Sequence, residues 1–366
     1  MDNAATSYPK PPVVSERVKA AIDNSINLSR TESERAFEAA TEIDDLRALL
    51  CTYYGSEDRD AIAFTRNVTE AINWAIKGFL KSGDKVIISS FEHNAVMRPL
   101  MQIGAKPIRL PCTEDGYIDY KNADIPKDAK AIFSTAASNV SGAIMDLAPL
   151  AEIAHKNKLL FFIDAAQYKA DLGKLGASGI CFTGHKSLLG PMGTGGLILK
   201  RNLAFEIDPL ITGGTGSQSD RIDVPTTLPD RLSPGTENIP GLLGLKAALE
   251  YKSAHSDELE ANEKARFEEL YTGLERNRKV TIHGPGLNKK RTSVISITTE
   301  MDEAEVAALL FERYGIETRV GLHCAVEAHK ALSTYPRGTL RLSPGPFTTK
   351  EEVEMTLKAL EEILNE

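Results

Sequence analysis

Long apolar runs and clusters of positive charge are both missing from this sequence of 366 residues. No stretch reaches the roughly 18 uncharged apolar residues that a membrane-spanning helix requires, so we expect no membrane partner. Lys and Arg number 43 against 51 Asp and Glu, which gives a formal charge of 43 − 51 = −8, and an acidic chain without a basic patch argues against nucleic acid as a partner. The opening residues, MDNAATSYPKPP, lack the basic-then-apolar pattern of a secretory signal, and we therefore expect a cytoplasmic protein.

Cysteine is scarce, and its four positions are scattered along the chain: Cys51, Cys112, Cys181 and Cys324. They form no CxxC pair and no spacing typical of a zinc site, and His323 and His329 bring no further ligand at such a spacing. We therefore expect reduced thiols and no bound metal.

The composition that remains is that of an ordinary folded protein, with 42% hydrophobic and 26% charged residues. This balance excludes a disordered or fibrous chain. The length indicates two domains, or one large domain with an appendage.

Short apolar segments alternate with helical patterns through the first half of the chain. Helices are expected at 32–50, 69–80, 94–103 and 147–158. Strands are expected at 61–65, 85–90, 107–111, 129–135, 159–164, 179–183 and 195–199. Strands that read as unbroken apolar runs between helices indicate an α/β fold with a mainly parallel sheet buried on both faces.

The second half begins with a different pattern. Residues 203–235 carry several prolines and few periodic segments, which predicts a long functional loop, and 242–277 predicts one long connecting helix. A smaller α+β unit is expected after it, with strands at 279–283, 292–298, 316–320 and 339–342 and helices at 302–314, 326–332 and 349–365.

Lys186 lies in the segment TGHKSLLGPMGTGG, directly after an apolar strand and before a glycine-rich turn. Most lysines are solvated surface charges. This one lies where the backbone can approach a ligand closely. A partly desolvated lysine has a lowered pKa and can form a Schiff base with a carbonyl compound.

Three further residues have two interpretations each. Asp164 ends the apolar strand LLFFID, where it would either cap the next helix or pair with a charged ligand at the carboxyl edge of the sheet. Gln167 would either contact the same ligand or be a solvent-exposed surface residue without a function in binding. Thr69 begins a helix, where it would be an ordinary N-cap or help the helix N-terminus to bind phosphate.

In chain order these residues combine with a histidine in SSFEHNAV and an asparagine in ASNVSG. In this order and spacing the chain resembles the fold-type-I enzymes that depend on pyridoxal 5′-phosphate (PLP). More narrowly, it resembles the class-V aminotransferase group that holds cysteine desulfurases and selenocysteine lyases. The resemblance runs from DNAAT at 2–6 to the last helix and includes RVGLHCA at 319–325 and GTLRLSPGPFTTKEEV at 338–353. It implies a large domain with a mainly parallel seven-stranded sheet between helices, and a smaller α+β carboxyl-terminal domain.

The resemblance also implies which residues would hold the ring of the cofactor. Lys186 would carry PLP as a Schiff base and later move the Cα proton of the substrate. Asp164 would pair with the pyridine nitrogen, and Gln167 would contact the phenolic oxygen. His93 would stack on the ring and handle protons, and Asn139 would contact the cofactor or the substrate.

The phosphate and the substrate would be held by other residues. Thr69, the backbone near Val68, and His185 would bind the phosphate. Thr236, in SPGTENIPG, matches a threonine that in this family reaches the phosphate of the neighbouring subunit, which implies a homodimer. Arg341 would bind the substrate carboxylate, a task that suits the guanidinium fork.

Cys324 would decide the reaction. A single cysteine is most often a small buried hydrophobe, but this one follows Arg319 and His323 in a loop, where nearby positive charge favours a thiolate. The match to the desulfurase loop implies conversion of L-cysteine to L-alanine, with sulfur transferred to Cys324 as a persulfide. A sulfur-acceptor protein would then collect the sulfur.

Two alternatives remain open from the sequence. A selenocysteine lyase, or another class-V aminotransferase or C–S lyase, would share every cofactor residue without needing Cys324. A protein that keeps the fold only as a binding partner is disfavoured because both Lys186 and Asp164 are present.

The domain boundaries expected from these patterns are simple. Residues 16–240 would form the large PLP-binding domain. Residues 1–15 and 241–366 would form the small domain, with the amino-terminal segment folded beside it.

Overall fold

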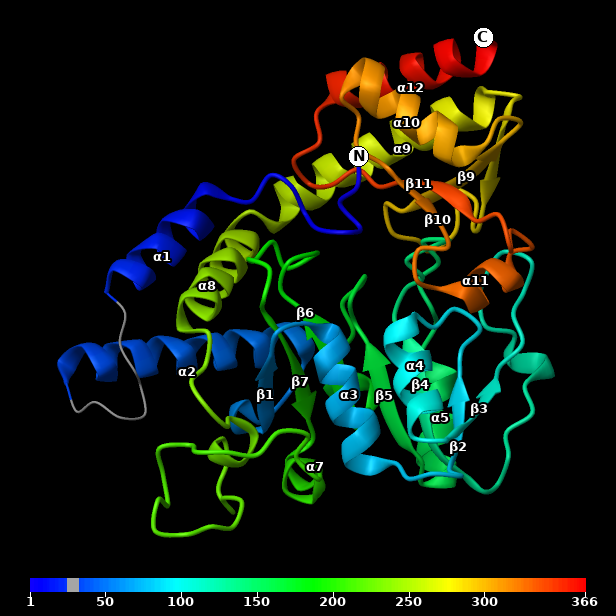
Figure 1. The fold of residues 1–366 in the computed structure, drawn as a ribbon. Coiled ribbons are helices and arrows are strands. Elements are labelled where there is room, and N and C mark those ends of the chain that lie inside the picture. The colour runs from blue at the N-terminus through cyan, green and yellow to red at the C-terminus, as the bar shows by residue number, and fades with distance from the viewer. Residues whose placement is uncertain (25–32) are drawn as a thin grey trace.

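A seven-stranded sheet, with strand order β1-β7-β6-β5-β4-β2-β3, forms the centre of the larger part of the molecule (Figure 1). The computed structural model describes residues 1–24 and 33–366. The strands are β1 (Ile62–Thr65), β2 (Lys85–Ile88), β3 (Lys106–Arg109), β4 (Ala129–Thr135), β5 (Leu160–Asp164), β6 (Gly179–Thr183) and β7 (Gly195–Leu199). Strands β3, β2, β4, β5 and β6 pair in parallel, whereas β7 is antiparallel to both β6 and β1. The predicted mainly parallel sheet is confirmed.

Both faces of this sheet are buried, which explains why its strands read as unbroken apolar runs. In β5, Phe161 and Ile163 join the core on one face, while Phe162 joins the core on the other. Successive side chains of a strand point to opposite faces, so a doubly covered strand is apolar along most of its length.

Six helices provide most of that cover. One face is covered by α2 (Glu34–Tyr54), α5 (Ala148–Asn157) and α8 (Ile239–Ala254). The other face is covered by α3 (Val68–Phe79), α4 (Asn94–Gln102) and α7 (Arg201–Glu206).

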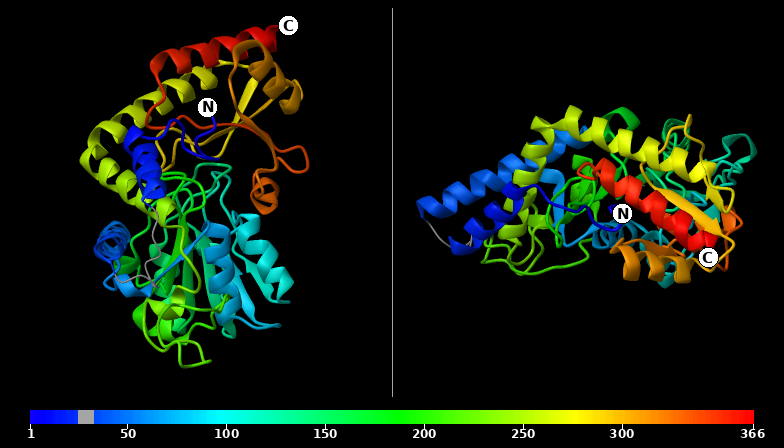
Figure 2. Two further views of the ribbon diagram at one scale, coloured as in Figure 1. Left: turned by 60° about the vertical axis from the view of Figure 1, so that its left-hand side comes forward. Right: turned by 90° about the horizontal axis from the view of Figure 1, so that it is seen from above.

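The smaller part of the molecule is built on a four-stranded antiparallel sheet of order β10-β11-β9-β8. Its strands are β8 (Val280–His283), β9 (Ile295–Thr299), β10 (Arg319–Gly321) and β11 (Thr339–Leu342). Its helices are α9 (Ser256–Arg276), α10 (Glu303–Tyr314), α11 (Val326–Ala331) and α12 (Lys350–Asn365). The helices α9, α10 and α12 lie against this sheet (Figure 2), and a separate core fills the space between them.

Several boundaries differ from the sequence-based expectation. The helix expected over 242–277 is two helices, because the chain breaks at His255 between α8 and α9. A helix that was not expected, α1 (Pro12–Asp23), packs along α8. The loop expected at 203–235 begins inside α7, and residue 32, the expected start of α2, lies outside the described residues.

The domain boundary expected at residue 240 stays a prediction. Helix α8 packs against α1 and α2 beside the large sheet, and α9 packs against α12 and β8 in the smaller part. Within the described ranges no helix is long and apolar enough to cross a membrane.

The amino-terminal residues lie against the end of β11. Asn3 N donates to the carbonyl oxygen of Ser343 at 3.1 Å, and Ser343 N donates to that of Met1 at 2.8 Å. The first residues of the chain therefore reach the smaller sheet, while α1 lies beside α8 (Figure 1).

Gly338 sets the close approach of β10 and β11. Its φ is +89°, and a Cβ built on it would lie 2.4 Å from the carbonyl oxygen of Gly321. We expect Gly338→Ala to lower the free energy of unfolding by about 2–4 kcal/mol, because it adds both a left-handed strain and a clash with backbone. Denaturant unfolding measures this. Gly286→Ala is the control, since no atom lies within 4 Å of its Cβ position, and an equal loss in both variants would contradict the account.

Candidate active site

Lys186 lies just beyond the end of β6, in a tight turn. The turn is closed by Leu189 N, which donates to the carbonyl oxygen of Lys186 at 2.9 Å, and by Gly190 N, which donates to that of Gly184 at 2.8 Å. Burial lowers the pKa of Lys186 to about 8, although the carboxylate of Asp164 acts in the opposite direction. A substantial fraction of this amine is neutral near physiological pH, and the neutral amine is the nucleophilic form.

Asp164 ends β5 and is almost fully buried. Its Oδ1 accepts from the backbone N–H of Ala166 at 2.9 Å. Burial raises its pKa, and the hydrogen bond from Ala166 and the charge of Lys186 lower it. No helix begins directly after Asp164, since α6 (Leu172–Leu175) is capped by Asp171, so the interpretation of Asp164 as a helix cap is wrong.

The amino-terminus of α3 carries two of the expected phosphate residues. The cap is Asn67, whose side-chain oxygen accepts from Glu70 N at 3.0 Å, so the alternative that Thr69 is the cap is wrong. Val68 and Thr69 are the first two residues of the helix, and within residues 1–24 and 33–366 their N–H groups have no acceptor. Such groups carry the positive end of the helix dipole and bind anions.

Two histidines near Lys186 are held neutral. His93 caps α4, and because its Nδ1 accepts from Ala95 N at 3.0 Å, its proton lies on Nε2. Burial and the charge of Lys186 lower the pKa of His93 to about 4. The same two causes lower the pKa of His185 to about 4, and its Nδ1 is buried with no partner among the described residues.

Gln167 lines one cavity together with Lys186, and its contact with a ligand stays a prediction. Its side-chain nitrogen donates to the carbonyl oxygen of Ala4 at 3.1 Å. The amino-terminal segment therefore touches the site here, and again at His185, whose carbonyl oxygen accepts from Ser7 N at 3.0 Å.

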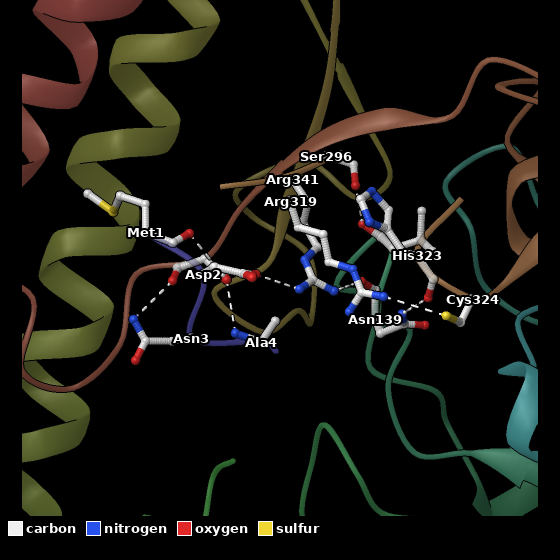
Figure 3. Close-up of polar contacts among 12 residues, drawn as sticks. Met1, Asp2, Asn3, Ala4, Asn139, Ser296, Arg319, His323, Cys324 and Arg341 are labelled. Atoms are coloured by element: carbon white, nitrogen blue, oxygen red, sulfur yellow. Dashed lines mark hydrogen bonds and ion pairs between the residues drawn. The ribbon is translucent and has the colours of Figure 1, made fainter. Parts of the chain in front are cut away.

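Arg341 is buried at the boundary between the two sheets, with 1% exposure (Figure 3). Its Nη1 donates to the carbonyl oxygen of Asn139 at 3.2 Å, and its Nη2 donates to Oδ1 of Asp2 at 2.6 Å. The Nε is buried and has no partner within the described residues. The side chain of Asn139 in turn donates to the carbonyl oxygen of His323 at 2.9 Å.

Cys324 is exposed, and Nη2 of Arg319 lies 3.5 Å from its sulfur (Figure 3). Both His323 and Cys324 have left-handed backbone, with φ of +46° and +57°, a strained conformation that clusters at functional sites. The strain is held by hydrogen bonds to two carbonyl oxygens, one from Asn139 to His323 and one from Asn94 N to Cys324 at 2.7 Å.

The other three cysteines differ from Cys324. Cys51 and Cys181 are buried and Cys112 is partly buried, and burial raises the pKa of each of these thiols. Cys324 is the exposed thiol among the four, and it lines one cavity with Thr69 and His93.

Thr236 is not brought to this site. It is exposed in the segment before α8 and makes no hydrogen bond to any described residue. The expectation that it serves a neighbouring subunit stays a prediction.

Two contributors were not found from the sequence. Asp2 falls in the motif DNAAT, but nothing local indicates that its carboxylate reaches a residue near the end of the chain. Glu92 precedes His93, and nothing local in the sequence indicates that its carboxyl group joins Ser89, just after β2, to Thr135 at the end of β4.

The large domain has a mainly parallel seven-stranded sheet with a lysine just after one of its strands, and the smaller domain has an antiparallel sheet. This is the architecture of fold-type-I enzymes, and the chain is of that class. The aminotransferase class-V family model matches residues 1–356. The chain belongs to the aminotransferase class-V family.

Similar proteins cover nearly the whole chain. A probable cysteine desulfurase of Halobacterium salinarum is 30% identical over an alignment of 382 positions. The alignment covers 99% of this chain and 90% of the relative. The cysteine desulfurase CsdA of Escherichia coli is 29% identical over 100% of this chain and 93% of its own. Among solved structures, the apo cysteine desulfurase of Thermococcus onnurineus has a TM-score of 0.89 at 29% identity, covering 100% of this chain and 94% of that one.

Members of this family use PLP, and the described residues fit that group. The amine of Lys186 suits an aldehyde, and the carboxylate of Asp164 suits a protonated ring nitrogen. The unpartnered Nδ1 of His185 and the free N–H groups at Val68 and Thr69 suit a phosphate.

Glu92 is fully buried, and its raised pKa makes a testable contribution to the pH dependence of stability. Its Oε1 accepts from Ser89 Oγ at 2.5 Å and from Thr135 N at 2.8 Å, and burial raises its pKa to about 8. The folded protein keeps this proton up to about pH 8, whereas the unfolded chain releases it near 4.5. The free energy of unfolding should therefore fall as pH rises through this window, by at most about 1.4 kcal/mol per unit from this group.

We expect Glu92→Gln to remove that contribution, which denaturant unfolding at several pH values measures. Glu114→Gln, at an exposed position, is the control and should keep the wild-type slope. A slope in Glu92→Gln as steep as that of the wild type would contradict the raised pKa.

Proposed function

We propose that the protein is a cysteine desulfurase, which converts L-cysteine to L-alanine and receives the sulfur on Cys324 as a persulfide. The observation that carries this proposal is the exposed Cys324 thiol, held on a strained loop beside the guanidinium of Arg319. The names of the similar proteins, which are cysteine desulfurases, support it.

The cofactor would be held by the residues around Lys186. Lys186 would bind it covalently, Asp164 would pair with the ring nitrogen, and His93 would lie against the ring. Gln167 would contact the phenolic oxygen. When bound, PLP supplies a sink for the negative charge that develops at the substrate Cα.

The phosphate of the cofactor would lie at the amino-terminus of α3. Val68 and Thr69 would donate their backbone N–H groups, and the Thr69 hydroxyl and His185 would complete the site. Thr236 of a second subunit would add a contact there, and we propose a homodimer on that ground. The exposed position of Thr236 is compatible with such a role.

The substrate would be oriented by its carboxylate. Arg341 would bind it through its guanidinium, whose Nε has no partner among the described residues. Asn139 would border the bound carboxylate, since its carbonyl oxygen already accepts from Nη1 of Arg341. Bound in this way, the substrate would present its Cα proton to the Lys186 amine, which is partly neutral at physiological pH.

The sulfur would then move to Cys324. Its thiolate attacks the substrate sulfur, so that an S–S bond forms while the Cβ–S bond breaks, and the substrate carbon skeleton leaves as alanine after protonation. Arg319 stabilises negative charge on the attacking sulfur. Because the product is a persulfide on an exposed residue, a sulfur-acceptor protein can collect it, and we place this chemistry in the reducing cytoplasm.

Selenocysteine is the alternative substrate, and amino transfer to a keto acid is the alternative reaction. Both would use the same cofactor residues, but neither would need Cys324, because selenium leaves more readily than sulfur and amino transfer breaks no C–S bond. A product assay with cysteine, selenocysteine and a keto acid separates the three.

We expect Cys324→Ala to reduce alanine formation from cysteine on the order of 100-fold, since the nucleophile for sulfur is removed. The measurement is alanine and sulfide release in the presence of a thiol reductant. Cys112→Ala is the control and should keep turnover within about twofold, because Cys112 lies at neither cavity of the site. Unchanged turnover in Cys324→Ala would rule out the role given to that thiol.

We expect the visible absorbance of the protein reconstituted with PLP to be lost in Lys186→Ala, because Lys186 is the amine whose pKa is lowered by burial beside the charge of Asp164. Borohydride reduction followed by peptide mapping should place the label on Lys186. Lys169→Ala, at an exposed lysine, is the control. A label on a different lysine in the wild type would overturn the assignment.

A further inference from the structure

Arg319 and Arg341 are direct partners across the antiparallel strands β10 and β11. Residues directly opposite in such a pair project from the same face, and like charges in that arrangement repel. Burial lowers the pKa of Arg341, and the charge of Arg319 lowers it further, so Arg341 needs a counter-charge. Asp2 supplies it to Arg341, through the ion pair of 2.6 Å between Oδ1 and Nη2 (Figure 3).

The carboxylate of Asp2 is held in place by its neighbours in the chain. The backbone on both sides of Asp2 is hydrogen-bonded to Ser343, through Met1 O at 2.8 Å and Asn3 N at 3.1 Å. Ala4 N also donates to the hydroxyl of Ser343 at 2.9 Å. Ser343 follows Arg341 by two residues, so the segment that carries Asp2 is fixed to the same strand end as the guanidinium that it pairs with.

The three nitrogen atoms of the Arg341 guanidinium differ in their partners. Nη2 donates to Asp2 and Nη1 donates to the carbonyl oxygen of Asn139, whereas Nε is buried and unpartnered within the described residues. A buried donor without an acceptor is costly, and a carboxylate bound beside Arg341 would complete the pairing of this Nε.

We propose that Asp2 is a positioning residue for substrate recognition: it fixes the Arg341 guanidinium so that Nε remains free for the carboxylate of the amino-acid substrate. This inference rests on the proposed function, in which Arg341 binds that carboxylate. Asp2 contacts Arg341 through one carboxylate oxygen and leaves Nε open, so it supports the substrate rather than competing with it.

The test is steady-state kinetics of the PLP-loaded enzyme with L-cysteine for the wild type, Asp2→Asn and Asp2→Glu. Loss of the charge on Asp2 loosens the guanidinium, and we expect Asp2→Asn to raise KM about tenfold with kcat within about twofold. Asp2→Glu keeps the carboxylate and should recover most of that loss. L-Alanine binding, followed by the change in cofactor absorbance, should weaken in parallel in Asp2→Asn.

Two controls separate positioning from a merely structural effect. Glu317→Gln removes an acid that borders the same groove as Asp2 but makes no hydrogen bond to Arg341, and it should leave KM unchanged. L-Cysteine methyl ester has no carboxylate, so the ratio of kcat/KM between Asp2→Asn and the wild type should stay near one. Thermal unfolding of each variant shows whether the fold is kept.

The outcomes distinguish this inference from the proposed function. An unchanged or lower KM in Asp2→Asn, together with a raised KM in Arg341→Ala, would overturn the role of Asp2 alone. An unchanged KM in Arg341→Ala would overturn the carboxylate site of the proposed function and Asp2 with it. An equal loss on the methyl ester would also overturn positioning, since that loss would not depend on a carboxylate.

Discussion

A fully buried guanidinium must have partners, and those of Arg341 join three distant segments of the chain. Asp2 comes from the amino-terminal segment, Asn139 follows β4 of the large sheet, and Arg341 itself lies on β11 of the small sheet. The hydrogen bonds of this one side chain join the smaller domain to the carboxyl edge of the larger sheet, together with others such as that from Ser296 Oγ to the carbonyl oxygen of Val140. The loop of Cys324 is fixed by the same network, because Asn139 also donates to the carbonyl oxygen of His323.

The chemistry on the other side of the site depends on desolvation. Burial lowers the pKa of Lys186 and raises that of Asp164, and the two opposite charges partly offset both effects. His93 and His185 stay neutral because burial and the nearby cations disfavour a further positive charge. The site therefore combines a reactive amine, a buried anion and neutral imidazoles, which are the properties that a PLP enzyme needs before substrate arrives.

Much of the fold could be predicted because its signals are local. Strands β4, β6, β7 and β11 match the expected ranges residue by residue. In the large sheet, burial of both faces leaves mainly apolar runs that the sequence shows directly. The break at His255 was missed because neither Gly nor Pro interrupts the helical pattern there. Helix α1 was missed because it begins in a proline-rich segment, although a proline such as Pro12 is favourable as the first residue of a helix. Lys186 and Asp164 could be found from their positions after apolar strands. The pairing of Asp2 with Arg341 could not, because it joins residues 339 positions apart.

The central claim is that Cys324 receives the sulfur of the substrate. Its most direct test is mass spectrometry of the cysteine-containing peptides after the PLP-loaded enzyme has reacted with L-cysteine in the absence of a reductant. We expect the Cys324 peptide to gain the mass of one sulfur atom, and the peptides of Cys51, Cys112 and Cys181 to stay unchanged. Formation of alanine with an unmodified Cys324 peptide, or with the added sulfur on another cysteine, would contradict the claim.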